Sequence, residues 1–347
     1  MNFQLLKKLS NADAIASNEN EVRSIIKDEL KEYKDSFEYD GLGSLIVTKK
    51  CKKKDAATIM FAAHMDEVGF MVRYISDIGF AFLIPIGSVE ERAKSMQLVR
   101  VTTKQGEKIE GLLNSLKDSE GKVNQIYVDF GFDSREEVEK SGIDVGDMVC
   151  FATNFRLLKS ENIVAGKAMD DRVGCYSLIK AMQSLVNVDL DVNIVAAFTS
   201  SEEVGTRGGK LVSKIVSPDL FFAIDVAKNP ELDRGYRNTR RLGRGVMLEF
   251  FDKTMVPNPR LLGYIMEIAK DSGIEYQKDM FKGGGTDAGS AHMENGGIIS
   301  SVLGLPLRYC HDPYSLANMN DVKSMQKLIK EIALRFNDEK IKDLYSF

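Results

Sequence analysis

Acidic and imidazole side chains stand directly after apolar, β-branched stretches at four separated points of the sequence. NIVAAFTSS is followed by Glu202 and Glu203, TIMFAA by His64 and Asp66, LFFAI by Asp225, and LPLRYC by His311. The carboxyl ends of neighbouring strands in an α/β sheet meet at one edge, where ligands bind. Oxygen and imidazole groups gathered there, joined by Asp170 at the start of a helical pattern, are the ligand set of a two-metal hydrolytic site.

Each of these residues also has a simpler interpretation when it is taken alone. Asp170 and Asp171 precede an amphipathic stretch and could serve as an N-cap. Glu202 and Glu203 could be solvated acids, because side chains alternate along a strand and neighbours need not share a site. The combination favours a metal site: two of the three histidines stand at strand ends beside acids. Burying so many carboxylates without cations would be costly.

The spacing of apolar residues predicts the elements that position these side chains. Residues 1–69 predict helices followed by strands, and residues 164–347 alternate between helix and strand. This alternation predicts an α/β fold with a doubly wound, mostly parallel sheet and helices on both faces. Residues 70–163 contain short alternating segments with glycine turns, which predict an inserted small all-β domain. Its one helical candidate begins at Ser134, which forms a capping box with Glu137.

Composition narrows the class of protein. The chain has 347 residues, 44% of them hydrophobic and 28% charged, with a net charge of −4, so neither nucleic acid nor an anionic membrane is an expected partner. No segment approaches the ~20 apolar residues of a membrane-spanning helix, and the N-terminus lacks an apolar signal-peptide core. Four cysteines without CxxC spacing are typical of reduced thiols. We therefore expect a cytoplasmic protein.

Six motifs, in order along nearly the whole chain, resemble one enzyme family. They are AHMDE (63–67), AMDDR (168–172), SEEVGTRGG (201–209), AIDV (223–226), KGGGTDAG (282–289) and RYCHDP (308–313). Together they are similar to the dinuclear metal aminopeptidases that include glutamyl aminopeptidase and the tetrahedral aminopeptidases, sometimes labelled cellulase M. Any one motif occurs by chance, whereas six in order are specific.

The resemblance implies a role for each matching residue. One metal ion would be held by His64, Asp170 and Asp225, and a second by Asp170, Glu203 and His311, with Asp170 as the bridge. Glu202 would be the general base that acts on a water between the metals, and Asp66 would orient the His64 ring. Ligands of this kind suit Zn or Co. The implied activity is removal of N-terminal residues from peptides. The implied assembly is a homo-oligomer, a dodecamer of about 465 kDa built from dimers of the 38.7 kDa chain through the inserted domain.

Several positions are open at the sequence level. The segment after Asp225 contains five arginines, which form either a solvated loop or, with Lys282, a site for an acidic substrate side chain. These arginines are Arg234, Arg237, Arg240, Arg241 and Arg244. The three glycines of KGGGTDAG predict either a loop with positive φ or a wall of the active site. Cys310 adjoins His311, and alternation along a strand predicts that it faces away from the ligands.

Two other functional classes compete with the peptidase. A β-1,4-glucanase would match the cellulase label. Glycosidases, however, use two facing carboxyl groups without paired metals. A non-catalytic binding protein on a peptidase scaffold is the other alternative, since a fold does not fix a function.

Overall fold

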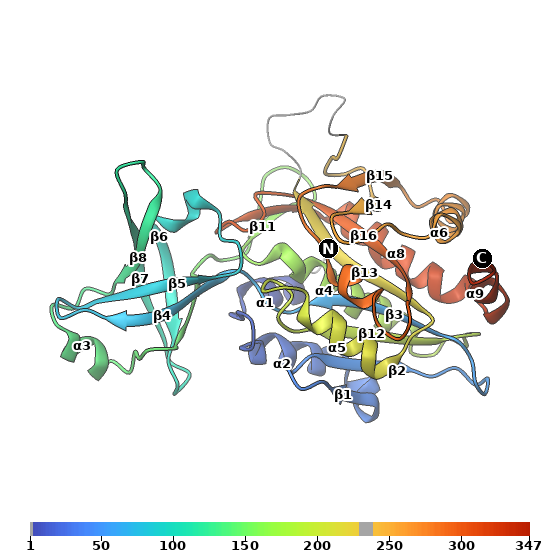
Figure 1. Cartoon of the computed structure of the whole chain (residues 1–347), viewed down its shortest axis with the longest axis horizontal. Coiled ribbons are helices and arrows are strands. Elements are labelled where there is room, and N and C mark those ends of the chain that lie inside the picture. Colours follow the sequence, from blue (N-terminus) through green and yellow to red (C-terminus); the bar gives the residue numbers. More distant parts are fainter. Residues whose placement is uncertain (1–2, 229–238) are drawn as a thin grey trace.

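A large mixed sheet and a small closed β-barrel share the chain in the computed structural model, which describes residues 3–228 and 239–347 (Figure 1). The described part of the sheet has eleven strands, nine of them in the order β1-β2-β12-β3-β13-β16-β17-β11-β10, while β14 and β15 branch from β16. Its strands are β1 (Phe37–Tyr39), β2 (Leu45–Lys49), β3 (Thr58–His64), β10 (Arg156–Leu157), β11 (Ile163–Gly166), β12 (Asn193–Thr199), β13 (Leu220–Lys228), β14 (Val246–Asp252), β15 (Tyr276–Phe281), β16 (Ile299–Arg308) and β17 (Ser315–Asn318).

The prediction of a mostly parallel sheet is correct only for the centre of this sheet. Strands β12, β3, β13 and β16 are parallel neighbours, and β14 is parallel to β15. The other described pairings, from β1–β2 to β10–β11, are antiparallel. Short connections such as those between β1 and β2 can only join antiparallel strands. The sheet is therefore mixed, with a parallel core that carries the strand ends of interest.

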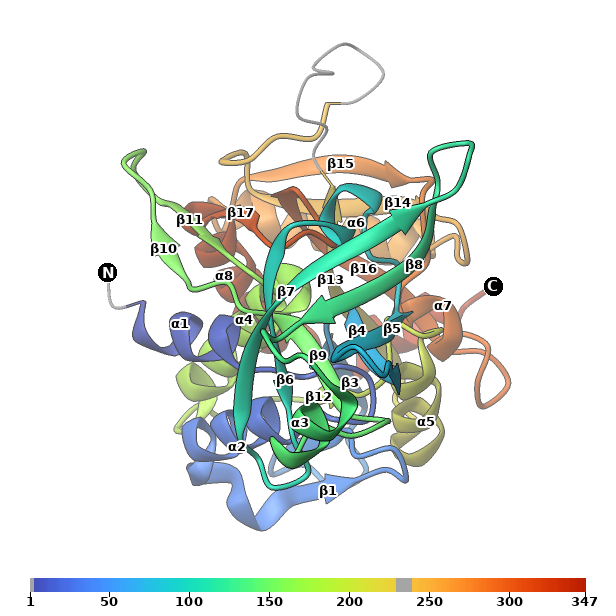
Figure 2. The ribbon, with the colours of Figure 1, turned by 90° about the vertical axis from the view of Figure 1, so that its left-hand side faces the viewer.

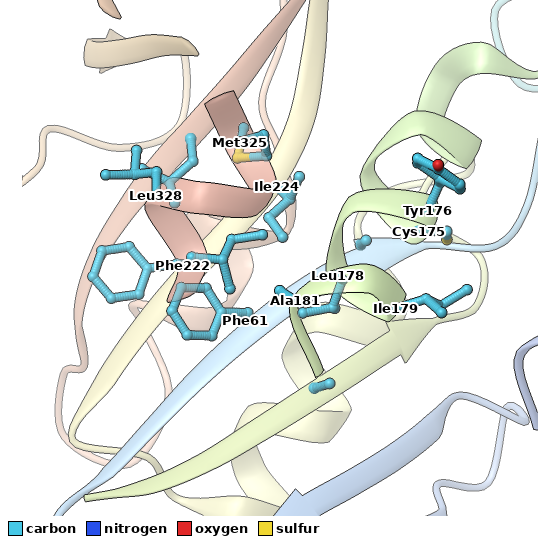
Figure 3. Packing of buried hydrophobic residues seen from close by; sticks show 14 of the residues in the cluster. Phe61, Cys175, Tyr176, Leu178, Ile179, Ala181, Phe222, Ile224, Met325 and Leu328 are labelled. Carbon is cyan, nitrogen blue, oxygen red and sulfur yellow. The ribbon is translucent and has the colours of Figure 1, made fainter. Parts of the chain in front are cut away.

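Successive residues of the central strands point to opposite faces of the sheet, and both sets are apolar. Helices therefore cover both faces. Phe61 and Phe222 stack with ring centroids 5.1 Å apart and pack with α4 (Met169–Leu185) and α8 (Met319–Arg335) on one face (Figure 3). Met60 and Phe221, one residue earlier on each strand, pack with α5 (Arg207–Val216) and α7 (Asp287–Ala291) on the other. This two-sided burial explains why these strands are continuous apolar runs rather than alternating ones.

Five of the described α-helices begin at a side chain that caps a backbone N–H group. Asn258 precedes Pro259 and its side chain accepts from the backbone N–H groups of Arg260 and Leu261, which starts α6. The α-helices are α1 (Gln4–Asn11), α2 (Asn20–Glu29), α3 (Arg135–Lys140), α4 (Met169–Leu185), α5 (Arg207–Val216), α6 (Pro259–Asp271), α7 (Asp287–Ala291), α8 (Met319–Arg335) and α9 (Asp338–Leu344). Two 3-10 helices, Lys31–Ser36 and Glu91–Lys94, complete them. Among the described residues, no helix combines the length and apolar character that crossing a bilayer requires.

The barrel closes in the strand order β4-β5-β8-β7-β6-β9 and projects from one end of the molecule (Figures 1 and 2). Its strands are β4 (Gly69–Ile75), β5 (Phe80–Ile86), β6 (Gln97–Thr102), β7 (Lys108–Lys117), β8 (Val123–Asp129) and β9 (Met148–Phe151). Half of the predicted capping box is present: the Ser134 hydroxyl accepts from the Glu137 backbone N–H at 3.3 Å and starts α3, but the Glu137 carboxylate accepts from the backbone N–H of Asp133 at 2.8 Å and not from that of Ser134. Strand β7 was not predicted, because polar residues interrupt its alternation.

Candidate metal centre

The predicted site residues lie at the carboxyl edge of the parallel core. His64 ends β3 and pairs with Thr199, the last residue of β12. Ala62 pairs with Ala223 on β13, so His64 and Asp225 lie two residues further along two adjacent parallel strands. His311 follows the end of β16, and Asp170 lies at the start of α4. Parallel pairing thus brings distant parts of the sequence to one place.

The carboxylate of Asp170 lies between two histidines. Its Oδ1 is 3.0 Å from His64 Nε2, and its Oδ2 is 3.2 Å from His311 Nε2. His311 Nε2 also lies 3.5 Å from Glu203 Oε2. One carboxylate whose two oxygens face two different imidazoles has the arrangement of a carboxylate that bridges two cations.

The other ring nitrogen of each histidine fixes its orientation. His64 Nδ1 lies 3.0 Å from the Asp66 carbonyl oxygen, and His311 Nδ1 lies 3.0 Å from the Ser88 carbonyl oxygen. A carbonyl only accepts, so Nδ1 carries the proton in both rings. In a neutral ring, Nε2 then presents a lone pair to a carboxylate oxygen, which is repulsive unless a cation or proton lies between them. Rings held in this way are typical of metal ligands, so the residues fit a metal site.

Asp66 holds the turn that carries the two glutamates. Its Oδ1 accepts from the backbone N–H of Glu202 at 3.0 Å, and its Oδ2 accepts from that of Glu203 at 3.1 Å. Its carboxylate is also near His64, with Oδ1 3.6 Å from Nδ1. Because β12 ends at Thr199, the two glutamates are in a turn rather than a strand, and both line the same pocket. Strand alternation therefore does not separate them.

The two aspartates in the first turn of α4 have different roles. Asp171 accepts from the Gly174 backbone N–H at 3.0 Å, as a helix cap does. Asp170, joined to it by a cis peptide bond, has non-helical φ and ψ and faces the histidines instead. The N-cap interpretation thus fits Asp171.

Asp225 lines a pocket of about 550 Å³ together with Asp170, Glu202, Glu203 and His311. It is 8% exposed, its Oδ1 accepts from the Val226 backbone N–H, and its Oδ2 accepts no hydrogen bond from the described residues. Potential ligand atoms of the described residues lie within 4.8 Å of one another in the groups His64, Asp170 and Glu203, and Asp170, Cys310 and His311. Asp225 adjoins these groups without belonging to either.

The charges of the site depend strongly on one another. Burial raises the pKa of Asp170, but hydrogen bonds from His311 and His64 prevail and hold it well below its usual range. Burial lowers the pKa of His311, but the nearby Glu203 and Asp170 raise it by more, so that it lies at about 10. Burial raises the pKa of Glu203 to about 7 and that of Asp225 well above its usual range. Buried acids shifted in this direction need positive charge nearby in order to ionise.

A buried ion cluster supports the loops that carry His64 and Asp170. Lys167 Nζ lies 2.6 Å from Glu67 Oε1 and 3.0 Å from Asp13 Oδ1, and Arg172 Nη2 lies 3.1 Å from Glu67 Oε1. Arg100 of β6 reaches Asp13 from the barrel, with Nε 2.6 Å from Oδ2. Asp13, Glu67 and Cys150 also lie close enough to hold a metal ion, but these cations already neutralise the acids.

The glycine loop lines the pocket, as one of its two interpretations predicted. Gly283, Gly284 and Gly285 do not have positive φ, so the other interpretation is wrong. At Gly285 the reason for glycine is space, since an added Cβ would clash with Thr254 Cγ2.

The described basic residues that were proposed to bind an acidic side chain lie outside the pocket. Arg240 is ion-paired with Asp279, and Arg241 and Arg244 line a separate groove. Arg234 and Arg237 are outside the described residues. Neither the three described arginines nor Lys282 is among the described residues that line the pocket. Its wall contains Lys228, whose Nζ is 3.0 Å from Glu90 Oε1.

Sequence reasoning missed Asp287, which connects two elements beside the site. Its carboxylate accepts from the Thr199 hydroxyl at 2.6 Å and from the Gly209 backbone N–H at 3.1 Å. It thereby ties the end of β12 to the start of α5, on either side of the Glu202 turn. Its place in the KGGGTDAG motif was the available signal.

A mixed α/β fold with histidines and carboxylates at the end of a parallel core has the ligand types that metal-dependent hydrolases use. Residues 43–328 match the family described as M42 glutamyl aminopeptidase, and the chain belongs to this family. The resemblance inferred from the motifs is therefore confirmed. The chain is therefore a peptidase, and peptidases of this family are metal-dependent. Its described residues include groups that could hold a metal ion.

Relatives align with the chain from end to end. The glutamyl aminopeptidase of Lactococcus lactis is 33% identical, covering 99% of each chain. The crystal structure of a TET aminopeptidase from a marine-sediment Thaumarchaeota archaeon has a TM-score of 0.93 at 30% identity, covering 99% of each chain. The TET1 peptidase of Pyrococcus horikoshii, described as able to assemble into a tetrahedron or a large octahedral shell, has a TM-score of 0.86 at 28% identity, covering 96% of this chain and 99% of that one.

Proposed function

We propose that this peptidase is a dinuclear metal aminopeptidase with Zn or Co as its ions. His64, Asp170 and Asp225 would hold one ion, and Asp170, Glu203 and His311 the other. The observation that carries the proposal is the Asp170 carboxylate, whose oxygens face His64 Nε2 at 3.0 Å and His311 Nε2 at 3.2 Å. When bound, two such ions supply Lewis acidity, which acidifies water and polarises a carbonyl.

The remaining carboxylates have separate duties in this mechanism. Glu202 lines the pocket, and its carboxylate accepts no hydrogen bond from the described residues, so it is available as a general base. It would take a proton from the attacking water and pass it to the leaving amine. Asp66 keeps Glu202 and Glu203 in place through their backbone N–H groups. The acidic lining also suits the positively charged N-terminus of a peptide, which favours exopeptidase action.

We propose that acidic N-terminal residues are preferred, on the strength of the name of the Lactococcus lactis relative and of Lys228 in the pocket wall. The ammonium of Lys228 is paired with Glu90 at 3.0 Å, so an acidic substrate would have to compete with this carboxylate. Substrates with N-terminal Glu, Leu and Lys, compared by kcat/KM, test the preference. A higher value for Lys than for Glu would contradict it.

We propose that residues 1–69 and 164–347 form the catalytic domain and residues 70–163 an oligomerisation module. Helices on both faces of the parallel core support describing the catalytic part as doubly wound. Leu98 and Leu112 are paired across β6 and β7 and are 46% and 50% exposed, which supports association through the barrel. The assembling Pyrococcus horikoshii relative supports a closed oligomer, which we propose to be a dodecamer built from dimers. Light scattering that gives only a monomer would exclude it.

We also propose a cytoplasmic location, supported by four cysteines that form no disulfide.

The proposed chemistry is tested by hydrolysis of glutamyl p-nitroanilide before and after chelation. Activity should be lost on chelation and restored by Zn or Co, and metal analysis should return two ions per chain. Release of sugar ends from carboxymethylcellulose serves as the control for the β-glucanase alternative. The family assignment predicts that no sugar ends are released. A purified, reconstituted protein without bound metal would instead support a non-catalytic binding protein.

A further inference from the structure

Cys310 lies against the proposed metal ligands, contrary to the prediction from strand alternation. Strand β16 ends at Arg308, and both Tyr309 and His311 have a φ of 60°. The chain therefore turns at Cys310 instead of continuing as a strand. Cys310 Sγ lies 2.9 Å from Asp170 Oδ2, the oxygen that His311 Nε2 approaches at 3.2 Å. Two consecutive side chains thus converge on one carboxylate oxygen.

The separations of these atoms are close to those of ligands that share an ion. Around a tetrahedral zinc ion, bond lengths of about 2.3 Å to sulfur and 2.0 Å to oxygen or nitrogen place sulfur about 3.5 Å from oxygen, and nitrogen about 3.3 Å from oxygen. The observed values are 2.9 Å and 3.2 Å. The thiol would need to move by about 0.6 Å, which a rotation about its side chain can provide.

An independent observation also indicates that cations belong here. Asp225 is 8% exposed and lines the same pocket as Cys310, and its Oδ2 has no hydrogen-bond partner among the described residues. This oxygen is not among the fully buried atoms that lack a partner, so it faces the pocket and is available to a cation. The thiol therefore lies in a pocket whose charge is not balanced by the described side chains alone.

We propose that Cys310 is a thiolate ligand of the ion held by Asp170, Glu203 and His311. This inference rests on the proposed dinuclear function. On binding, the S–H bond breaks, the proton passes to solvent and a bond forms between Sγ and the metal, with no change of oxidation state. Cys310 would give this ion four protein ligands, against three for the ion of His64, Asp170 and Asp225, and a water shared between the two ions would make it five-coordinate.

The proposal makes the two sites chemically different. A thiolate favours Zn or Co over Mn or Mg, which prefer oxygen ligands, so the Cys310 site should discriminate more strongly between these metals. In the purely structural alternative, the Cys310 thiol donates a weak hydrogen bond to Asp170 and its small apolar side chain packs against the core cluster. The two differ in whether sulfur is bonded to the metal.

Cobalt-substituted protein distinguishes them by absorption. Wild type loaded with two Co(II) ions should show a thiolate-to-cobalt charge-transfer band in the near ultraviolet, and Cys310→Ser should lose it. Cys51→Ser is the matched control, since Cys51 lies in the loop after β2, where its Sγ is 3.6 Å from the Lys53 carbonyl oxygen, and it should keep the band. Zinc-edge X-ray absorption of the wild type should show one sulfur at about 2.3 Å for every two zinc ions.

The outcomes separate this inference from the proposed function. Wild-type protein that binds two cobalt ions and hydrolyses peptides without the thiolate band overturns the role of Cys310 alone. Protein that binds no cobalt overturns both. Because the wild-type spectrum and the zinc-edge measurement decide the matter by themselves, a Cys310→Ser variant that fails to fold does not obscure the result.

Discussion

Replacing Asp66 with Asn tests whether one buried carboxylate holds the catalytic turn. Its two oxygens accept from the backbone N–H groups of Glu202 and Glu203 at 3.0 Å and 3.1 Å, and the side chain is fully buried. Asn has a single acceptor oxygen, so its amide N–H₂ must face one of these N–H groups. One charge-assisted hydrogen bond is lost, and a buried backbone donor loses its partner.

The size of the effect follows from these contacts. A hydrogen bond to a charged group contributes about 1.5–3 kcal/mol, and a donor left without a partner costs about 1–3 kcal/mol. Because both figures include the loss of the same contact, they are not added in full, and the free energy of unfolding should fall by about 2–4 kcal/mol. An unfolding entropy of about 2.1 cal/mol/K per residue over 347 residues converts this loss to a Tm decrease of about 3–6 °C. Displacing Glu202 by about 1 Å should lower kcat about 100-fold.

Asp321→Asn is a matched control for this experiment. Asp321 is also buried, and its two oxygens accept from the backbone N–H groups of Gly243 and Gly245, both at 2.7 Å, away from the pocket. Calorimetry should show that both variants lose stability, whereas kcat and bound metal should fall only in Asp66→Asn. The reasoning is refuted if Asp66→Asn keeps the kcat and metal content of the control.

Three further changes probe the base, the buried ions and a buried acid. Glu202→Gln should lower kcat by about 10²–10⁴-fold and retain both metals in metal analysis; loss of the metals would show that Glu202 is a ligand. Lys167→Met leaves the buried Glu67 without its 2.6 Å partner and should lower the free energy of unfolding by about 3–5 kcal/mol in denaturant titration, and Glu67→Gln added to it should recover part of that loss. Burial and the facing Asp279 raise the pKa of Glu249 from 4.5 to about 9. Between pH 4.5 and pH 9 the Glu249 carboxyl keeps its proton in the folded state but loses it in the unfolded state. The contribution of this group to the free energy of unfolding should therefore fall by about 1.4 kcal/mol per pH unit as the pH rises over this range. Glu249→Gln should remove that slope, and an unchanged slope would exclude Glu249 as its origin.

The sequence by itself determined which segments form the core and which side chains reach its edge. Continuous apolar runs such as those ending at His64 and Thr199 are buried strands, because only strands covered on both faces are apolar throughout. The all-β character of the insert was also predicted, apart from β7, whose polar residues hide its period, but its closure as a barrel was not. Local patterns record periodicity and the ends of elements well, since both depend on neighbouring residues.

Tertiary structure alone decided how those ends meet. Antiparallel flanks around the parallel core, the double contact of Asp170 with His64 and His311, and the Asp66 contacts with the glutamate turn all join residues far apart in the chain. The left-handed conformations on either side of Cys310 turn its thiol toward Asp170, where strand alternation would have turned it away. Such geometry depends on which partners a loop meets in the folded chain, and no local pattern contains that information.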